Sequence, residues 1–256
     1  IGCGNMGGAL ARALSKSTKD ILIADKNPAI ENLARELGAA FGCVEQAAAC
    51  DHVFLAVKPQ MVAAVLAPLQ GIFAAKKPVV ISMAAGMSVA QIEEFVGTSL
   101  PIIRIMPNTP CAVGKGMISY CCNSLVTDEM IATFLADMAP AGRFEQLDEK
   151  LMEAATAVAG CGPAFMYMFI EAMADGGVVC GLPRDKAIAY AAATMEGAAR
   201  MVLETGTHPG ALKDAVCSPG GSTIVGVNTL EENGFRGAVM DCVKAAYEKS
   251  VALGKK

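Results

Sequence analysis

The chain has 256 residues, of which 54% are hydrophobic and 18% charged, a balance typical of a globular protein with a well-buried core. Its formal net charge of −4 provides no overall basic field, which argues against binding to nucleic acid or to an anionic membrane surface. The ten cysteines are spread along the chain without a C-x-x-C motif, and the two histidines lie far from any cysteine pair. We therefore expect free, buried thiols in a reducing cytoplasm and no metal site.

The first part of the chain, up to residue 146, alternates short apolar strands with amphipathic helices. Strands are expected at 20–25, 51–57, 78–83 and 101–106, and helices at about 60–69 and 88–96. A further helix has Asn27 as its N-cap, Pro28 as its first residue and Gly38 at its end. This alternation predicts a Rossmann-type, doubly wound parallel sheet. Because Ile1 directly precedes a glycine-rich turn, most of a first strand is expected to lie before this numbering.

The pattern changes near Asp148, beyond which only helical periodicity is found. Helices are expected at 149–159, 163–180, 184–204, 209–216 and 222–253, the last interrupted at Gly234. This predicts two domains, an α/β domain over 1–147 and an all-helical domain over 148–256. The apolar stretch 161–182 contains Glu171 and Asp175, so we expect a buried helix rather than a membrane span. The two carboxylates lie one helical turn apart, which favours pairing in the core or at an interface over acid–base chemistry.

The sequence GCGNMG at 2–7 has the G-x-G-x-x-G spacing of a phosphate-binding turn. In such a turn two glycines let the backbone approach a pyrophosphate, the third allows close helix packing, and the helix N-terminus faces the anion. Asp25 ends the next strand about twenty residues later, where a carboxylate can hold a ribose hydroxyl. An ordinary turn before a helix is the alternative, but the alternation that follows favours dinucleotide binding. Asp25 favours NAD, whereas Lys26 and Asn27 could pair with the 2′-phosphate of NADP, and both cofactors stay open.

Three further turns lie where an open α/β sheet binds its ligand, beyond the carboxyl ends of strands. They are AVKP at 56–59, MAAG at 83–86 and the rigid MPNTP at 106–110. Small residues in the first two would let a cofactor lie on the backbone, although tight connections without a ligand look similar. In the third, Asn108 either orients the nicotinamide or the substrate, or closes the turn with an Asx hydrogen bond, and the residues alone leave these interpretations open.

A late segment, CSPGGSTIVGVNTLE at 217–231, combines a proline, two adjacent glycines and two hydroxyls with an apolar run. These residues alone favour a helix–helix connection with a serine cap. The chain also contains, in order, GCGNMG, AVKP, AAG (84–86), MPNTP, GPAF (162–165) and GLP (181–183), and SPGGST (218–223) completes the set. These motifs cover essentially the whole chain, which in this respect resembles the pyrroline-5-carboxylate reductases.

The resemblance implies reduction of 1-pyrroline-5-carboxylate to L-proline, the final step of proline biosynthesis, with NADPH as the more usual donor and NADH as the alternative. It implies substrate contacts at Ser222 and Thr223. Together with Asp25 from the phosphate-turn pattern, the expected cofactor contacts are Ile1, Gly2, Cys3, Gly4, Asn5, Met6, Lys26, Ala56, Val57, Lys58, Pro59, Met83, Ala84 and Ala85. One position departs from the family pattern, because Cys43 stands where a polar residue, often asparagine, usually meets the adenosine ribose.

The substrate implied by this resemblance is a small ring with a carboxylate and an imine nitrogen. Gly220 and Gly221 would expose main-chain amides at a helix start, which suits a carboxylate without lysine or arginine. Pro219 stiffens the approach to the turn, and the Thr223 hydroxyl can hydrogen-bond the ring nitrogen. No histidine, lysine or carboxylate is spaced as a proton donor, so Thr223, or a water it holds, is the predicted catalytic group. The apolar residues expected to anchor this loop to the helical core are Ile224, Val225 and Val227.

Long helices rich in alanine, methionine and glycine, such as 187–204, predict close packing against a second copy. The resemblance implies an interlocked homodimer that assembles further, for instance into a decamer. Two alternative functions fit the sequence less well. A β-hydroxyacid dehydrogenase would need a lysine on the first long helix after the sheet, and 163–180 contains none. A module that binds NAD(P)H without turnover would not need the intact 218–223 loop.

Overall fold

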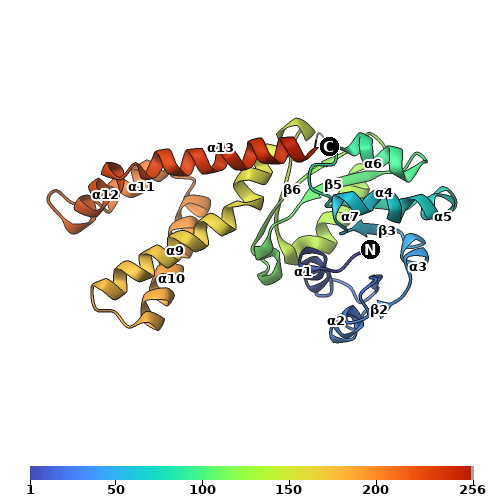
Figure 1. Cartoon of the computed structure of the whole chain (residues 1–256), viewed down its shortest axis with the longest axis horizontal. Coiled ribbons are helices and arrows are strands. Elements are labelled where there is room, and N and C mark those ends of the chain that lie inside the picture. The colour runs from blue at the N-terminus through green and yellow to red at the C-terminus, as the bar shows by residue number, and fades with distance from the viewer. Residues whose placement is uncertain (255–256) are drawn as a thin grey trace. The chain divides into compact units, whose positions relative to one another are not determined.

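A computed structural model describes residues 1–254 and divides the chain into two compact units (Figure 1). The first unit comprises residues 1–163 together with the chain from Ala245 onward, and the second comprises residues 164–244. The first unit contains all the strands of the described residues, and the second is helical. Each unit is described by itself below.

The first unit contains a five-stranded sheet in the order β3-β4-β5-β6-β7 and a separate parallel pair, β1-β2. The strands are β1 (Leu22–Ile23), β2 (Ala40–Phe41), β3 (His52–Leu55), β4 (Val79–Ser82), β5 (Ile102–Met106), β6 (Gly116–Cys122) and β7 (Gly142–Gln146). The four strands expected from the sequence correspond to β1, β3, β4 and β5. These strands and the Rossmann-type fold class are therefore confirmed. The sheet is mixed rather than all parallel, because β6 runs antiparallel to β5. Residues 107–115 are too few for the crossover that a parallel neighbour requires.

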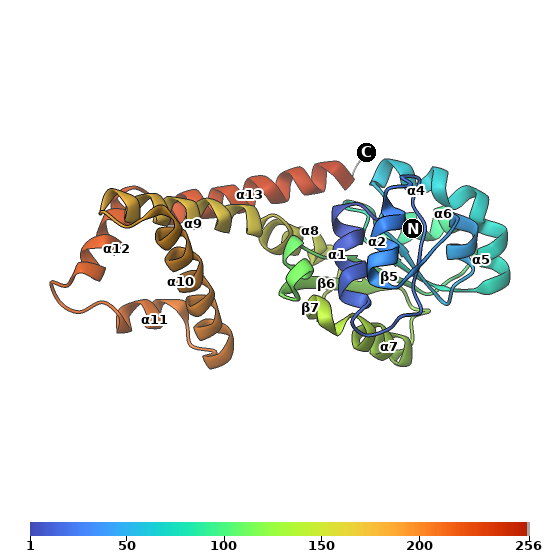
Figure 2. The same ribbon diagram turned by 90° about the horizontal axis from the view of Figure 1, so that it is seen from below.

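Helices cover both faces of this sheet (Figure 2). The helices of this region are α1 (Asn5–Leu14), α2 (Ile30–Leu37), α3 (Val44–Ala48), α4 (Pro59–Leu66), α5 (Gln70–Lys76), α6 (Val89–Val96) and α7 (Asp128–Met138). Of these, α2 packs on the β1-β2 pair instead. Gly38 ends α2 with a φ of 70° as expected, but α2 begins at Ile30 rather than Pro28. The reason is local: the side-chain oxygen of Asn27 accepts the N–H of Ala29 at 3.1 Å, which holds residues 27–29 in a turn.

The core lies on the two faces of β4 and β5, where every residue is buried. Alternate residues serve opposite faces, so Val80 and Ile102 pack with α4 and α6, whereas Ile81 and Ile103 pack with α1 and α7. Such strands read as continuous apolar runs in the sequence, which is why they were predictable. The ends of these strands fix where the loops between strands and helices emerge.

The helical part begins with α8 (Met152–Ala155) and a π-helical segment (Thr156–Gly160), which still belong to the first unit. The remaining helices are α9 (Gly162–Val179), α10 (Arg184–Thr205), α11 (Pro209–Ala215), α12 (Ser222–Glu232) and α13 (Phe235–Gly254). The predicted helical segments are all present, and Gly234, with a φ of 70°, makes the predicted break.

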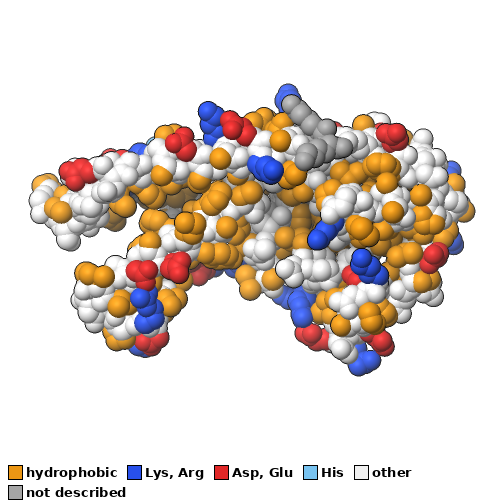
Figure 3. Space-filling view, viewed as in Figure 1, with side chains coloured by type: hydrophobic (Ala, Val, Ile, Leu, Met, Phe, Trp, Pro, Cys, Tyr) orange, Lys and Arg blue, Asp and Glu red, His pale blue; other side chains and the backbone are white. Residues whose placement is uncertain are grey.

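The prediction of a buried helix over 161–182 is wrong for the single chain, because α9 buries only Ala174. Tyr167, Met168 and Val179 are 59%, 69% and 88% exposed, and Figure 3 shows hydrophobic side chains along the helices of the second unit. By length and composition, the helical stretch Glu149–Val179 would also pass for a membrane span. Apolar faces as extensive as this normally pack against another surface. Asp175 pairs with Arg184, but the two side chains are 58% and 52% exposed, so this ion pair is not in the core, and pairing at an interface stays a prediction.

Candidate active site

The glycine-rich turn packs tightly against the end of β3. A Cβ on Gly2, whose φ is 82°, would lie 2.8 Å from Val57 Cγ1 and 2.9 Å from the carbonyl oxygen of Ala56. A Cβ on Gly7 would lie 2.4 Å from the carbonyl oxygen of Gly2 and 2.9 Å from Ala56 Cβ. By contrast, nothing lies within 4 Å of a Cβ on Gly4. A side chain at Gly2 or Gly7 would thus clash with the protein itself, whereas the space beside Gly4 is open.

Helix α1 begins directly after Gly4, whose position as N-cap has no side chain to accept the first amides. The first hydrogen bond of the helix runs from Gly8 N to Gly4 O at 2.8 Å. The main-chain N–H groups of Asn5, Met6 and Gly7 therefore have no partner within the helix. Free amides at a helix N-terminus, beside an open glycine, form a fitting cradle for a phosphate group.

The predicted cofactor residues of the first unit converge at the carboxyl ends of β1, β3 and β4. The carbonyl oxygen of Ile1 accepts Ala56 N at 2.9 Å, and Gly2 N donates to Ala24 O at 2.8 Å. Met83 N donates to Leu55 O at 3.2 Å. The main chain thus joins segments 1–7, 24–25, 55–57 and 83, as expected for a ligand site on an open α/β sheet.

Asp25 fixes the phosphate turn from the side of β1. Its Oδ2 accepts Cys3 N at 2.6 Å and its Oδ1 accepts Asn27 N at 2.7 Å. Both carboxylate oxygens therefore already serve the protein's own backbone, which ties the glycine turn to the loop after β1. Lys26 is exposed on that loop. Asp25 therefore has a structural role that does not require a ribose hydroxyl. The side chain of Lys26 is available to bind a 2′-phosphate.

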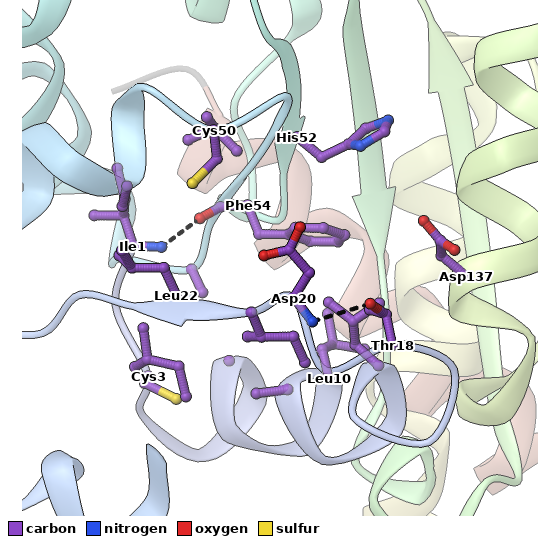
Figure 4. A pocket seen from close by; sticks show the side chains of 18 of the residues that line it. Ile1, Cys3, Leu10, Thr18, Asp20, Leu22, Cys50, His52, Phe54 and Asp137 are labelled. Carbon is purple, nitrogen blue, oxygen red and sulfur yellow. Dashed lines mark hydrogen bonds between the residues drawn. The ribbon is translucent and has the colours of Figure 1, made fainter. Parts of the chain in front are cut away.

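A cavity of about 460 Å³ lies between β1 and β3 (Figure 4). Its lining is mostly apolar and comes from α1, β1, β3 and α7, with Leu10, Ile23 and Phe54 among the side chains. Gly2, Ala56 and Met83 also line it, so the cavity adjoins the convergence point described above. The lining does not include Lys26, Lys58 or Ala84. The cavity is a gap between the two sheets rather than the predicted cofactor site as a whole.

Asn108 is buried and its amide bridges two segments of main chain. Its Nδ2 donates to the carbonyl oxygen of Ala159 at 2.9 Å, and its Oδ1 accepts Met117 N at 3.0 Å. A local Asx bond to residue 110 cannot form because Pro110 has no N–H. Asn108 instead holds the π-helical segment 156–160, a type of irregularity that is frequent at functional sites. Its predicted contact with substrate stays a prediction.

The predicted substrate loop lies in the second unit. Gly220 has a φ of 68°, and Gly221 is the N-cap of α12 without a side-chain acceptor. Gly221 N already donates to Ser218 O at 3.0 Å, so it is not the free amide that the sequence suggested. The amide of Gly220 makes no hydrogen bond within residues 1–254, and the amides of residues 222–224 are free in the first turn of α12. Ser222 and Thr223 are exposed, and their hydroxyls make no hydrogen bond within residues 1–254.

The apolar residues behind this loop do not anchor it in the single chain. Ile224 and Val225 are exposed, with 62% of Val225 accessible, and Val227 is only half-buried. All ten cysteines are free, but only Cys3, Cys111 and Cys121 are buried, so the expected burial of the thiols is wrong for the other seven. No cluster of metal-binding side chains occurs in residues 1–254. Burial raises the pKa of the Cys3 thiol beside the turn, so this thiol is protonated near neutral pH.

Comparison with known proteins assigns the chain to a family. A family model described as pyrroline-5-carboxylate reductase dimerisation matches residues 149–253, and one described as NADP oxidoreductase coenzyme F420-dependent matches residues 1–86. The pyrroline-5-carboxylate reductase of Escherichia coli (strain K12) is 43% identical over 262 residues, which cover 100% of this chain and 97% of that protein. The chain belongs to the pyrroline-5-carboxylate reductase family.

Other pyrroline-5-carboxylate reductases give the same result. That of Pisum sativum is 38% identical over 99% of this chain and 94% of its own length. The crystal structure of Plasmodium falciparum pyrroline carboxylate reductase with NADP bound matches with a TM-score of 0.86 at 35% identity, over 99% of this chain and 96% of that one. The Coxiella burnetii pyrroline-5-carboxylate reductase gives a TM-score of 0.91 at 29% identity, over 100% and 97%. The resemblance inferred from the motifs is thereby confirmed.

Proposed function

We propose that this protein reduces 1-pyrroline-5-carboxylate to L-proline with NADPH as its preferred donor and NADH as the alternative. Full-length similarity to pyrroline-5-carboxylate reductases supports the reaction. The single observation of the structure that carries it is the phosphate turn, which Gly2 and Gly7 hold against the end of β3 beside the free amides of α1. Within the second unit, the first turn of α12 presents free amides and the exposed residues Ser222 and Thr223.

The residues of the first unit fit NADP. The free amides of α1 and the open side of Gly4 suit the pyrophosphate, and we assign the exposed Lys26 to the 2′-phosphate. The turns 56–59 and 83–85 lie at the carboxyl ends of β3 and β4, where Lys58 and Ala85 are exposed and Ala84 is buried. When bound, NADPH supplies the hydride for the reduction.

The residues of α12 are assigned to the substrate. The main-chain N–H groups of residues 222–224, strengthened by the helix dipole, hold its carboxylate. The Thr223 hydroxyl hydrogen-bonds the ring nitrogen and orients the C=N bond, either directly or through a water that it holds. Because a protonated imine is already a good electrophile, the chain needs to supply orientation and exclusion of water rather than a strong acid.

We further propose that the protein acts as a homodimer, or as a higher homo-oligomer such as a decamer, in the cytoplasm. The exposed apolar faces of α9 and α10 and the match to a dimerisation family support self-association. A net charge of −4 supports neither nucleic acid nor an anionic membrane as a partner. Functionally, residues 1–147 form the NAD(P)-binding domain, and residues 148–256 form the domain for substrate binding and dimerisation.

Kinetics of Thr223→Ala test the proposal, with Thr229→Ala as the matched control. Thr229 lies on the same helix, and its hydroxyl donates to Val225 O at 3.2 Å, within the helix itself. We expect Thr223→Ala to lower kcat by roughly a hundredfold, a typical cost of losing a catalytic hydrogen bond, with the Kd for NADPH unchanged. Thr229→Ala should behave like the wild type. Equal losses of kcat and of NADPH affinity in Thr223→Ala would contradict the assigned role.

A further inference from the structure

A buried arginine in the central strand of the first unit holds two glutamates that lie outside the sheet. Arg104 in β5 is 3% exposed. Its Nη1 donates to Glu149 Oε1 at 3.2 Å, and its Nη2 donates to Glu153 Oε1 at 2.5 Å. Its Nε has no hydrogen-bond partner among the described residues. The two carboxylates are therefore the groups that balance this buried charge.

Each of these glutamates makes a second contact. Glu149 Oε1 also accepts Val89 N, the first amide of α6, at 2.7 Å, where a negative charge stabilises the helix. Helix α6 begins at Val89, with two residues between it and the 83–86 turn. Glu153 Oε2 accepts the hydroxyl of Ser250, near the end of α13. Arg104 thus connects β5 with the start of α6, the α8 region and the end of α13.

The chain leaves the first unit and returns to it at this cluster. Residues 149–163 lead out of the first unit, and the chain from Ala245 onward leads back into it. The end of α13 also packs on the 83–86 turn, because a Cβ on Gly254 would lie 2.7 Å from the carbonyl oxygen of Gly86. The chain segments that lead to and from the substrate loop therefore both contain residues that contact the Arg104 cluster. The second segment also contacts the turn assigned to the cofactor.

We propose that Arg104 is a positioning residue for the reaction, because it fixes the two chain passages through which the 218–223 loop is attached to the cofactor-binding unit. This inference rests on the proposed function. A residue needed only for stability changes how much protein is folded, whereas a positioning residue changes the turnover of each folded molecule. Arg104 makes no hydrogen bond to a residue assigned to cofactor or substrate. Its loss should therefore lower turnover while cofactor affinity is retained.

The test compares Arg104→Met and Arg104→Lys with the control Arg143→Met. Arg143 lies on β7 and pairs with Glu145, but its side chain is 60% exposed. For each folded variant, kcat and KM for pyrroline-5-carboxylate, the Kd for NADPH and hydrogen exchange of residues 245–254 are measured well below the unfolding temperature. Glu153→Gln is a second variant, which keeps the shape of the side chain and removes its charge, in case Arg104→Met does not fold.

For Arg104→Met we expect kcat/KM to fall at least about tenfold and the Kd for NADPH to stay within about twofold. Exchange in 245–254 should become faster. Arg104→Lys should recover part of the activity, because an ammonium can pair with one carboxylate but cannot fork to both. Glu153→Gln should change in the same direction as Arg104→Met, and Arg143→Met should not change.

The proposal is overturned if Arg104→Met, or Glu153→Gln in its place, keeps kcat/KM within about twofold of the wild type. It is also overturned if NADPH affinity falls in parallel with turnover. A wild-type protein that oxidises no NADPH would refute the proposed function instead. In that case the exchange data still decide the anchoring role, with faster exchange in 245–254 supporting it and unchanged exchange contradicting it.

Discussion

Two glycines of the phosphate turn should respond to the same substitution in opposite ways. In Gly7→Ala the new Cβ would lie 2.4 Å from the Gly2 carbonyl oxygen and 2.9 Å from Ala56 Cβ, well inside ordinary contact at about 3.5 Å. Neither neighbour is the end of a flexible side chain, so the turn must move. Overpacking of this kind costs about 2 kcal/mol, which lowers the Tm of a chain of this length by roughly 4–8 °C.

Gly4→Ala is the matched substitution at a position with open space. Nothing lies within 4 Å of its new Cβ, and its φ of −66° suits alanine, so we expect a change in Tm of less than about 2 °C. The added methyl would occupy space assigned to the pyrophosphate, and we expect the Kd for NADPH to rise at least about tenfold. Thermal unfolding without cofactor and a fluorescence titration with NADPH measure both effects. A Gly4→Ala variant with wild-type affinity, or a Gly7→Ala variant with wild-type Tm, would refute this reasoning.

Three further predictions concern charge, pH and assembly. Lys26→Ala should weaken the binding of NADPH about tenfold and leave the binding of NADH nearly unchanged, and Lys16→Ala, at another exposed lysine, is the control. Equal effects on the binding of both cofactors would contradict a contact between Lys26 and the 2′-phosphate. Burial raises the pKa of Cys121 from 9.0 to about 12. Its contribution to stability is therefore complete below about pH 9 and is lost as the pH rises towards 12, because the unfolded chain ionises first. Cys121→Ala should flatten this alkaline fall in the free energy of unfolding, and an unchanged slope would contradict the assignment. Met168→Glu on the exposed face of α9 should shift the mass measured by light scattering towards the monomer, and an unaltered mass would place the interface elsewhere.

The sequence predicted the elements whose signals are local. Strands β3, β4 and β5 are continuous apolar runs, and Gly38 and Gly234 marked a helix end and a break that the structure shows at those residues. Strands β6 and β7 were not predicted, since β6 includes glycine, serine and cysteine and pairs in the less expected antiparallel direction. Burial of α9 was predicted wrongly, because an apolar sequence indicates that a face will be covered but not which chain covers it.

The site was predictable as a set of motifs but not as a set of hydrogen bonds. The turn residues 2–7 and 56–57 are in contact, in keeping with their predicted place at the carboxyl ends of strands. However, the sequence could not show that Asp25 binds the turn's own backbone or that Gly221 N is already used by Ser218. Arg104 was missed, although one arginine within the apolar run PIIRIM is a recognisable signal. A charge in a strand that is buried on both faces requires a partner, and only the structure identifies Glu149 and Glu153.

Isotope transfer tests the central claim most directly. The purified protein is given 1-pyrroline-5-carboxylate and NADPH that carries deuterium at the transferable position of its nicotinamide, and the proline formed is examined by mass spectrometry. The account predicts L-proline in a one-to-one ratio with the NADPH oxidised, each molecule carrying a single deuterium on the former imine carbon. Oxidation of NADPH without proline, or proline without the label, would contradict it.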